Sequence, residues 1–206
     1  YAMGDIIRLD GQPYLEFLIP GLVAMASMTQ AFAIATDINV ARFYWKIFEE
    51  FQAAPISNLA YVAGETLAGV TRALMAIAVI LLLSLFFGVF LHYGFWFWLA
   101  VLLNAAVFAG LAVALAMLVK SHADQSLLTS FIITPMAFLG GTFFPLDNLP
   151  GWVQSLLSLL PLTHASHAIR AAALGQPSNW ADYWLLAALA VLFFIFALRC
   201  VGHARD

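Results

Sequence analysis

The chain has 206 residues and a formal net charge of −3, and 64% of its residues are hydrophobic while only 9% are charged. An average soluble domain carries about 25% charged residues, so this composition excludes an ordinary soluble protein. Together with a mean hydropathy of +0.96, it indicates an integral membrane protein. We expect membrane lipid around the chain and no nucleic acid as a partner.

Five apolar runs are each close to the roughly 20 residues that a membrane-spanning helix needs. They cover residues 17–35, 67–87, 95–119, 127–144 and 180–200. We therefore predict an all-α integral membrane protein with five transmembrane helices, which form a single domain over residues 1–206.

The basic residues predict the orientation, because cytoplasmic loops of membrane proteins are enriched in lysine and arginine. If the connection after the first crossing is cytoplasmic, only Arg8 and Arg170 lie outside. Six basic residues then lie inside: Arg42, Lys46, Arg72, Lys120, Arg199 and Arg205. Residues 1–16 and 140–178 become external by this assignment, and residues 37–64 and the C-terminal tail 199–206 become cytoplasmic.

The cytoplasmic segment has the pattern of an amphipathic surface helix over residues 41–52. Apolar side chains recur there at helical spacing, and four charged residues fall towards the other side: Arg42, Lys46, Glu49 and Glu50. Such a helix either anchors the segment at the headgroup boundary or docks a cytoplasmic subunit. Pro55 stops the helix and Ser57 or Asn58 can cap the next one, so a short lever leads directly into the second crossing. This favours docking.

The stretch 138–175 is apolar but is interrupted by Pro145, Pro150 and Pro161. A proline interrupts a helix, so the two remaining pieces, of about ten and about a dozen residues, are too short to cross about 30 Å of hydrocarbon. We predict an external re-entrant hairpin of two short helices, whose shape is set by these prolines and Asp147. Broken backbone is tolerated at membrane depth only where protein or a water-filled cavity covers it, as along a pathway for cargo.

Polar residues within the crossings look few, and we expect their middles to contain Asn104 and little else. Glu65 and Arg72 share a face of the second crossing, where they either pair with a neighbouring helix near the interface or line a pathway. Asn104 lies in a stripe of small residues, which favours a helix-joining role over a ligand site. Pro135 with Thr134 predicts a kink that either lines a pathway or only packs.

His164, His167 and Arg170 share one face of the second hairpin piece. A metal site has little support, because no HExxH motif and no nearby carboxylate complete a ligand set, and we expect the two histidines to face a cavity or headgroups. No catalytic constellation is visible, so we do not expect an enzyme. The chain lacks a phosphate-binding GxxxxGK[ST] loop, so ATP and Mg would be bound by a partner ATPase subunit and no cofactor by this chain.

Three stretches resemble the membrane-spanning permease subunits of type 2 ABC exporters, the family of nodulation lipo-oligosaccharide, polysaccharide and daunorubicin-like drug exporters. Residues 14–25 (YLEFLIPGLVAM) are similar to the start of that family's second span, and residues 48–57 (FEEFQAAPIS) to its cytoplasmic coupling helix. Residues 140–152 (GGTFFPLDNLPGW) with 160–164 (LPLTH) are similar to its external re-entrant hairpin. The family has six crossings, so the resemblance implies that the first is missing from these five.

The resemblance implies a homodimer of permeases with two ATPase subunits in a bacterial-type cytoplasmic (inner) membrane, and the basic residues predict a cytoplasmic C-terminus. The implied complex would export an amphipathic or lipid-linked cargo by alternating access. The alternative is a stand-alone secondary transporter or channel, which usually places charged or unwound groups at the midplane. An intramembrane enzyme is a third class and lacks a catalytic constellation. The aromatic residues suit either a membrane belt or a sugar-stacking track, so drug, glycolipid and polysaccharide all remain open as cargo.

Overall fold

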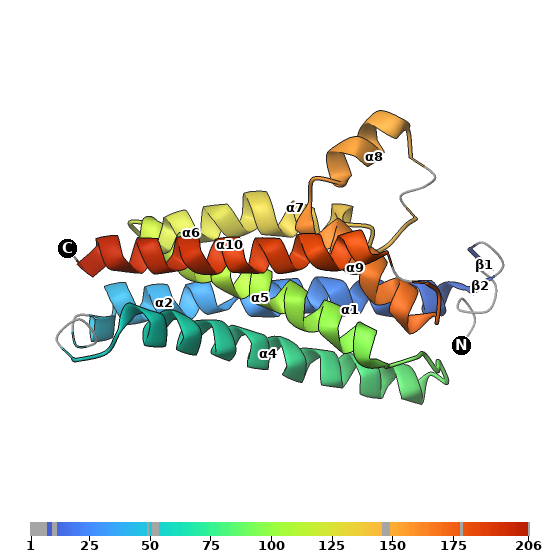
Figure 1. The fold of residues 1–206 in the computed structure, drawn as a ribbon, viewed down its shortest axis with the longest axis horizontal. Helices are drawn as coiled ribbons and strands as arrows, with labels where there is room; N and C mark the ends of the chain where they lie inside the picture. Colours follow the sequence, from blue (N-terminus) through green and yellow to red (C-terminus); the bar gives the residue numbers. More distant parts are fainter. Residues whose placement is uncertain are drawn as a thin grey trace.

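The computed structural model describes residues 8–9, 12–48, 50, 54–145, 149–177 and 179–205. Long helices run side by side along one axis (Figure 1). Apart from the short antiparallel pair of β1 (Arg8–Leu9) and β2 (Gln12–Pro13), the regular elements of the described residues are helical. The prediction of an all-α integral membrane protein is confirmed.

Four helices in the described residues are long and apolar enough to cross a membrane. The first combines α1 (Tyr14–Phe32) and α2 (Ile34–Phe43), and the others are α4 (Asn58–Phe86), α5 (Phe95–Leu118) and α10 (Trp180–Arg205). Each contains a predicted crossing. The first two extend beyond their apolar runs, because the helical backbone continues into polar residues. Both ends of the expected connection 37–64 are therefore helical.

The fifth predicted crossing, residues 127–144, is not one regular helix. Three consecutive pieces cover this part of the chain: α6 (His122–Leu128), the π-helical turn η1 (Thr129–Ile133) and α7 (Thr134–Leu139). The cause is local, because Pro135 has no N–H to donate and a π turn just before it absorbs the defect. The helix stops before Gly140, and residues 140–144 form a turn. Of the five predicted transmembrane helices, four are long apolar helices, and the fifth is an interrupted helix that runs parallel to them (Figure 1).

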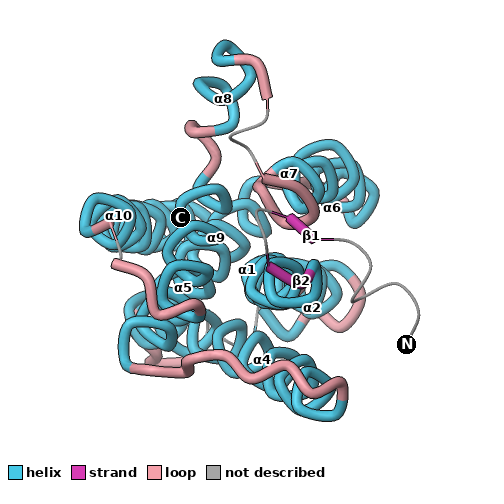
Figure 2. The backbone as a smooth tube through the Cα atoms, turned by 90° about the vertical axis from the view of Figure 1, so that its right-hand side faces the viewer, coloured by secondary structure: helices cyan, strands magenta, loops and turns pink. Residues whose placement is uncertain are grey.

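The two ends of the bundle carry different connections (Figure 1). One end, here called the elbow end, holds the connection between α2 and α4, the start of α6 and the C-terminus. The other end, here called the hairpin end, holds the N-terminus, the starts of α5 and α10, and the short helices α8 (Gly151–Leu157) and α9 (Pro161–Ala173). Viewed along the axis, α1, α5 and α9 lie towards the centre, and α4, α10 and α6–α7 surround them (Figure 2).

The predicted hairpin of two short helices is present, and prolines delimit it. Pro150 immediately precedes α8, and Pro161 is the first residue of α9, where a missing N–H costs no helical hydrogen bond. Pro145 follows the turn after α7, and Asp147 lies outside the described residues. The two arms differ, because α9 is buried against α1, α5 and α10 whereas α8 projects from the bundle and exposes Trp152 (Figure 1).

Small residues let the central helices approach closely. A Cβ added to Gly69 of α4 would lie 2.9 Å from the Ala109 side chain of α5 and 3.0 Å from the Ala31 carbonyl oxygen of α1. Asn104 of α5 is fully buried and donates a 2.5 Å hydrogen bond to the Ser27 hydroxyl of α1. This contact is what a helix-joining role for Asn104 requires.

Gly21 generates the first testable prediction, because it lies where α1 meets the turn after α7. A Cβ at Gly21 would overlap the backbone carbonyl oxygen of Thr142, so Gly21→Ala is expected to push the two elements apart and lower the melting temperature by several degrees. The matched control is Gly64→Ala in α4, where the added Cβ meets nothing within 4 Å and alanine is the better helix former by about 1 kcal/mol. Thermal unfolding in lipid nanodiscs measures both variants. Equal stability of the two variants would contradict the close approach.

Candidate functional site

A groove of about 350 Å³ runs between the first spanning helix and the interrupted helix α6–η1–α7. One wall comes from α1, Ala33 and α2, and the other from η1 and α7. Apolar side chains such as Met25 and Phe138 line part of it. Four lining residues are threonines, and we call this feature the threonine groove: Thr29, Thr36, Thr129 and Thr134.

Both walls of the threonine groove depart from regular α-helix. A turn at Ala33 separates α1 from α2, and η1 interrupts the opposite wall. In η1 the backbone N–H of Thr134 donates to the carbonyl oxygen of Thr129, five residues earlier, as in a π-helix. Irregular backbone at membrane depth is tolerated where it lines a cavity, and π turns are frequent at functional sites. The two irregularities line one groove.

Polar side chains lie at the middle of both walls. Thr29 and Gln30 are midway along the first spanning helix, and Thr129 and Ser130 are midway along α6–η1–α7. Gln30 and Ser130 are exposed. The expectation that the middles of the crossings contain Asn104 and little else is therefore wrong. It failed because short polar pairs hardly lower the hydropathy of a long apolar run, and only helix pairing shows that Thr29 and Thr129 line one groove.

Contacts hold the groove walls together at both ends. At the elbow end, Asn39 of α2 donates through Nδ2 to Oε1 of Gln125 in α6 at 3.1 Å, and both side chains are buried. At the hairpin end, Gly21 of α1 lies against the backbone of Thr142. The walls are therefore joined at their ends and separate between them.

The predicted amphipathic helix over residues 41–52 is present only in part. The elbow, residues 44–57, begins after Phe43 and is helical again at residues 47, 48 and 50. Helix α2 ends at Phe43, and Lys46 has a φ of +56°, in the left-handed region that interrupts an α-helix. The predicted apolar stripe is divided accordingly, because Phe43 and Tyr44 are exposed whereas Phe48 is buried.

Arg42 contacts the protein interior instead of lying on the outward face. Its guanidinium donates to the carbonyl oxygen of Ala116, in the last turn of α5, where carbonyls lack helical partners. It also lies over the rings of Phe43 and Phe48, at 5.1 and 5.4 Å from their centroids. Arg42 thus fastens α2 to α5, which corrects its predicted position among outward docking charges.

The other charges predicted for the elbow are exposed where the structure describes them. Lys46 and Glu50 are exposed, and Glu49 lies outside the described residues. Phe48 packs edge-on against Tyr61 of α4, with ring centroids 5.7 Å apart. The elbow is therefore attached to α4 through an aromatic contact and presents charge on its outer side.

Glu65 and Arg72 of α4 have separate partners. Arg72 forms a 2.7 Å ion pair with Asp37 of α2, as the interpretation of a salt bridge to a neighbouring helix requires. Glu65 is hydrogen-bonded to Tyr61, one turn earlier in α4. Neither residue lines the threonine groove.

His164 holds the buried arm of the hairpin to α10. Its Nδ1 lies 2.6 Å from Oδ1 of Asp182, and its Nε2 lies 2.8 Å from the carbonyl oxygen of Ser158, just after α8. A carbonyl only accepts, so Nε2 donates to Ser158, and Nδ1 is left to share the second hydrogen bond with the Asp182 carboxyl group. Asp182 is only 6% exposed. The expectation that His164 faces a cavity or headgroups is corrected to a structural contact.

Arg170 fastens the same arm to the bundle. It donates to the carbonyl oxygen of Gly141 at 2.7 Å, and its guanidinium lies 3.9 Å from the centroid of the Phe17 ring. Of the three residues expected to share a polar face, His167 is the exposed one. The polar residues of α9 therefore serve mainly to position the helix.

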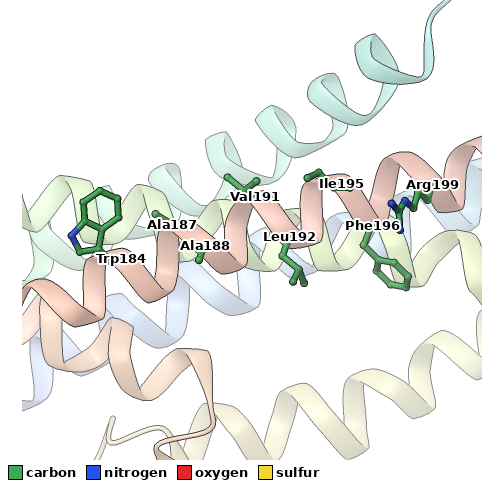
Figure 3. Close-up of a pocket in the computed structure, with 8 residues that line it drawn as sticks. All are labelled: Trp184, Ala187, Ala188, Val191, Leu192, Ile195, Phe196 and Arg199. Atoms are coloured by element: carbon green, nitrogen blue, oxygen red, sulfur yellow. The ribbon is translucent and has the colours of Figure 1, made fainter.

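A second hollow lies along α10 and has different chemistry (Figure 3). Its lining is aliphatic and aromatic apart from Arg199 at one end. Val191 and Leu192, near its middle, are more than half exposed. A surface without polar groups at mid-depth suits lipid tails, and it provides a reference for the threonine groove.

Sequence reasoning missed the residues that build the groove. Asn39 and Gln125 lie near helix ends, where polar side chains are common, so neither attracts attention alone. Two polar pairs stand within apolar runs, Thr29–Gln30 and Thr129–Ser130. These pairs are the sequence feature that could have indicated the groove.

Four apolar helices and a threonine-lined groove between two interrupted helices are typical of a multi-pass membrane transport protein. Residues 4–174 match the family model described as ABC-2 type transporter. The chain is 32% identical over 201 residues to the inner membrane transport permease YadH of Escherichia coli, across 96% of this chain and 78% of that protein. It is 31% identical over 182 residues to nodulation protein J of Sinorhizobium fredii, across 87% of this chain and 70% of that protein. It is 25% identical over 201 residues to the daunorubicin resistance ABC transporter permease protein DrrB1 of Streptomyces coeruleorubidus, across 96% of this chain and 71% of that protein. The chain belongs to the ABC-2 type transporter family, which confirms the resemblance seen in its sequence.

The contact between His164 and Asp182 generates a stability prediction. Hydrogen bonds to charged groups contribute about 1.5–3 kcal/mol, so His164→Ala and Asp182→Ala should each lower the melting temperature. Because one contact is lost in both variants, the double variant should lose clearly less than the sum of the two. His203→Ala, which removes an exposed histidine from the opposite end of α10, is the control and should change little. Additive losses would show that the two side chains act independently.

Proposed function

We propose that the chain is the membrane subunit of an ATP-driven exporter, in which two copies enclose a pathway and two ATPase subunits drive it by alternating access. The observation that carries the proposal is the threonine groove with its polar residues at mid-depth. An amphipathic or lipid-linked cargo needs such a surface to move its polar part through hydrocarbon. The name of the relative DrrB1, an ABC transporter permease protein in daunorubicin resistance, supports both the ATPase partnership and an amphipathic cargo.

A second copy of the chain is proposed because the polar face needs a cover. A polar group without hydrogen-bond partners costs several kcal/mol in hydrocarbon. Gln30 and Ser130, which follow the lining residues Thr29 and Thr129 in sequence, are exposed near the middle of their helices. A second copy facing this groove would remove both side chains from lipid and leave the groove between the two protomers.

The elbow is the proposed docking site for the ATPase subunit, and the elbow end is the proposed cytoplasmic end. The exposed Lys46 and Glu50, together with Glu49, are the proposed contacts. The subunit would supply ATP and Mg, since the sequence has no GxxxxGK[ST] loop. Four basic residues near the elbow end support the orientation by the positive-inside rule: Lys46, Lys120, Arg199 and Arg205.

The hairpin end is then external in a bacterial inner membrane, with the C-terminus in the cytoplasm. Helix α9 is buried between α1, α5 and α10 at that end. Its contacts through His164 and Arg170 support a role in closing the outward end of the pathway at rest.

A stand-alone secondary transporter would also use polar groups at mid-depth. Coupling to protons or ions, however, usually relies on ionisable groups in the pathway. The residues that line the threonine groove are hydroxyl-bearing or apolar, which favours the ATP-driven alternative.

Proteoliposomes that hold the chain with an ATPase subunit provide the test, with Ser130→Cys introduced in a Cys200→Ser background. A short bis-maleimide should join two copies through this position and reduce ATP-driven daunorubicin or glycolipid movement to background. Leu192→Cys on the apolar face of α10 is the matched control, and it should give neither cross-linked dimers nor loss of transport.

Two results would contradict the proposal. One is cargo movement that continues at full rate without the ATPase subunit. The other is a cross-linked dimer through Leu192→Cys but none through Ser130→Cys, which would place the second copy against α10 and not against the threonine groove.

A further inference from the structure

The threonine hydroxyls of the groove have a specific hydrogen-bond polarity. Thr29 Oγ1 donates to the carbonyl oxygen of Met25 at 3.0 Å, and Thr129 Oγ1 donates to that of Gln125 at 3.0 Å. Thr134 Oγ1 donates to the carbonyl oxygen of Thr129 at 3.1 Å. Each of these three hydroxyls therefore directs its hydrogen to its own helix.

A hydroxyl has one hydrogen and two acceptor lone pairs. Once its hydrogen is given to the backbone, it offers only lone pairs to a ligand. Thr29, Thr129 and Thr134 thus present acceptors from both walls of the groove, and the residues that line it include no lysine, arginine or histidine. A group that only accepts, such as a phosphate dianion or a carboxylate, would have to break one of these three backbone bonds to gain a hydrogen from them. A hydroxyl or ammonium group would not. The exposed hydroxyl of Thr36, the fourth lining threonine, makes no such bond among the described residues and is the one lining hydroxyl with a hydrogen to give.

The rest of the lining is apolar. Met25, Phe32 and Ile133 line the groove beside the threonines, and Phe138, at 54% exposure, lines it as well. Such walls accommodate an alkyl chain or ring next to the polar group. The lining therefore matches an amphipathic molecule.

We propose that the threonine groove binds amphipathic molecules whose polar group donates hydrogen bonds, a hydroxyl-rich or ammonium headgroup, in preference to molecules with an anionic headgroup only. The proposal rests on the function proposed above, because it names the class of cargo that the groove admits. The threonine groove would then select its ligand by hydrogen-bond polarity and not by attraction between opposite charges.

The proposed preference can be tested without ATP or a partner subunit. The measurement is how well a bound ligand, at equilibrium, protects a cysteine in the threonine groove from labelling. Ala33→Cys in a Cys200→Ser background is labelled by a maleimide in nanodiscs of zwitterionic lipid. Octyl glucoside, octylammonium, octyl phosphate and octanoate then compete as probes of equal chain length. Octyl glucoside and octylammonium should each protect the cysteine at about tenfold lower concentration than either anion, the change expected for one hydrogen bond. Their relative order shows whether the hydroxyl or the ammonium source is preferred.

The combined variant Thr29→Val, Thr129→Val and Thr134→Val keeps the shape of the side chains and removes the lone pairs. It should reduce the tenfold preference to less than about twofold, whereas the corresponding Thr→Ser variant should keep it. Thr71→Val is the matched control, because Thr71 also donates to its own helix, to Leu67 at 2.8 Å, but on exposed α4 outside the groove.

Three results would overturn the inference: equal protection by the anions, a preference that survives the triple valine variant, or the same loss in Thr71→Val. If the valine variant misfolds, the comparison of the four probes in the protein with intact threonines still tests the inference. Because this assay needs no transport, a failed ATP-driven transport experiment with an intact preference would reject the proposed function and leave the groove's selectivity standing.

Discussion

The first spanning helix is fastened to α6 at one end and to the turn after α7 at the other, and the groove exists because the two walls separate between these points. Gly21 permits backbone contact with Thr142 at the hairpin end, and Asn39 bonds to Gln125 at the elbow end. The amide pair adds little net stability, since Asn39 Oδ1 and Gln125 Nε2 are buried without a hydrogen-bond partner in the described residues and such atoms cost about 1–3 kcal/mol each. Its contribution is register, because a directional bond fixes how the two helices slide along each other.

Contacts at the elbow end of the bundle connect the threonine groove to the elbow. Arg42 ties α2 to α5 through Ala116, and Phe48 ties the elbow to α4 through Tyr61. If the elbow docks the ATPase as proposed, its movement reaches the groove through the end of α2 and the Asn39–Gln125 bond. The turn at Ala33 and the π turn η1 are then the points where the walls bend most easily, because neither keeps the regular α-helical hydrogen-bond pattern.

Helix existence could be predicted because long apolar runs and prolines act locally. Ser57 caps α4 by accepting from the Ala60 amide, and Pro161 begins α9, both as local chemistry dictates. What could not be predicted depends on pairing between distant segments. Arg42 turns inward because α5 ends beside it, and His164 pairs with Asp182 because α9 packs on the start of α10. The threonine groove likewise needs two helices that lie about a hundred residues apart in the chain.

The central claim is that water or cargo, and not lipid, contacts the polar mid-depth of this groove. Its most direct measurement is the reaction rate of a charged, membrane-impermeant methanethiosulfonate with Thr29→Cys, compared with Leu192→Cys at a similar depth on α10, in the Cys200→Ser chain assembled with the proposed ATPase subunit in proteoliposomes. The account predicts that Thr29→Cys reacts at least about tenfold faster, because a thiol in hydrocarbon ionises and meets the reagent far less readily. Equal, slow reaction at both positions would mean that the groove is filled by lipid, and it would contradict the account.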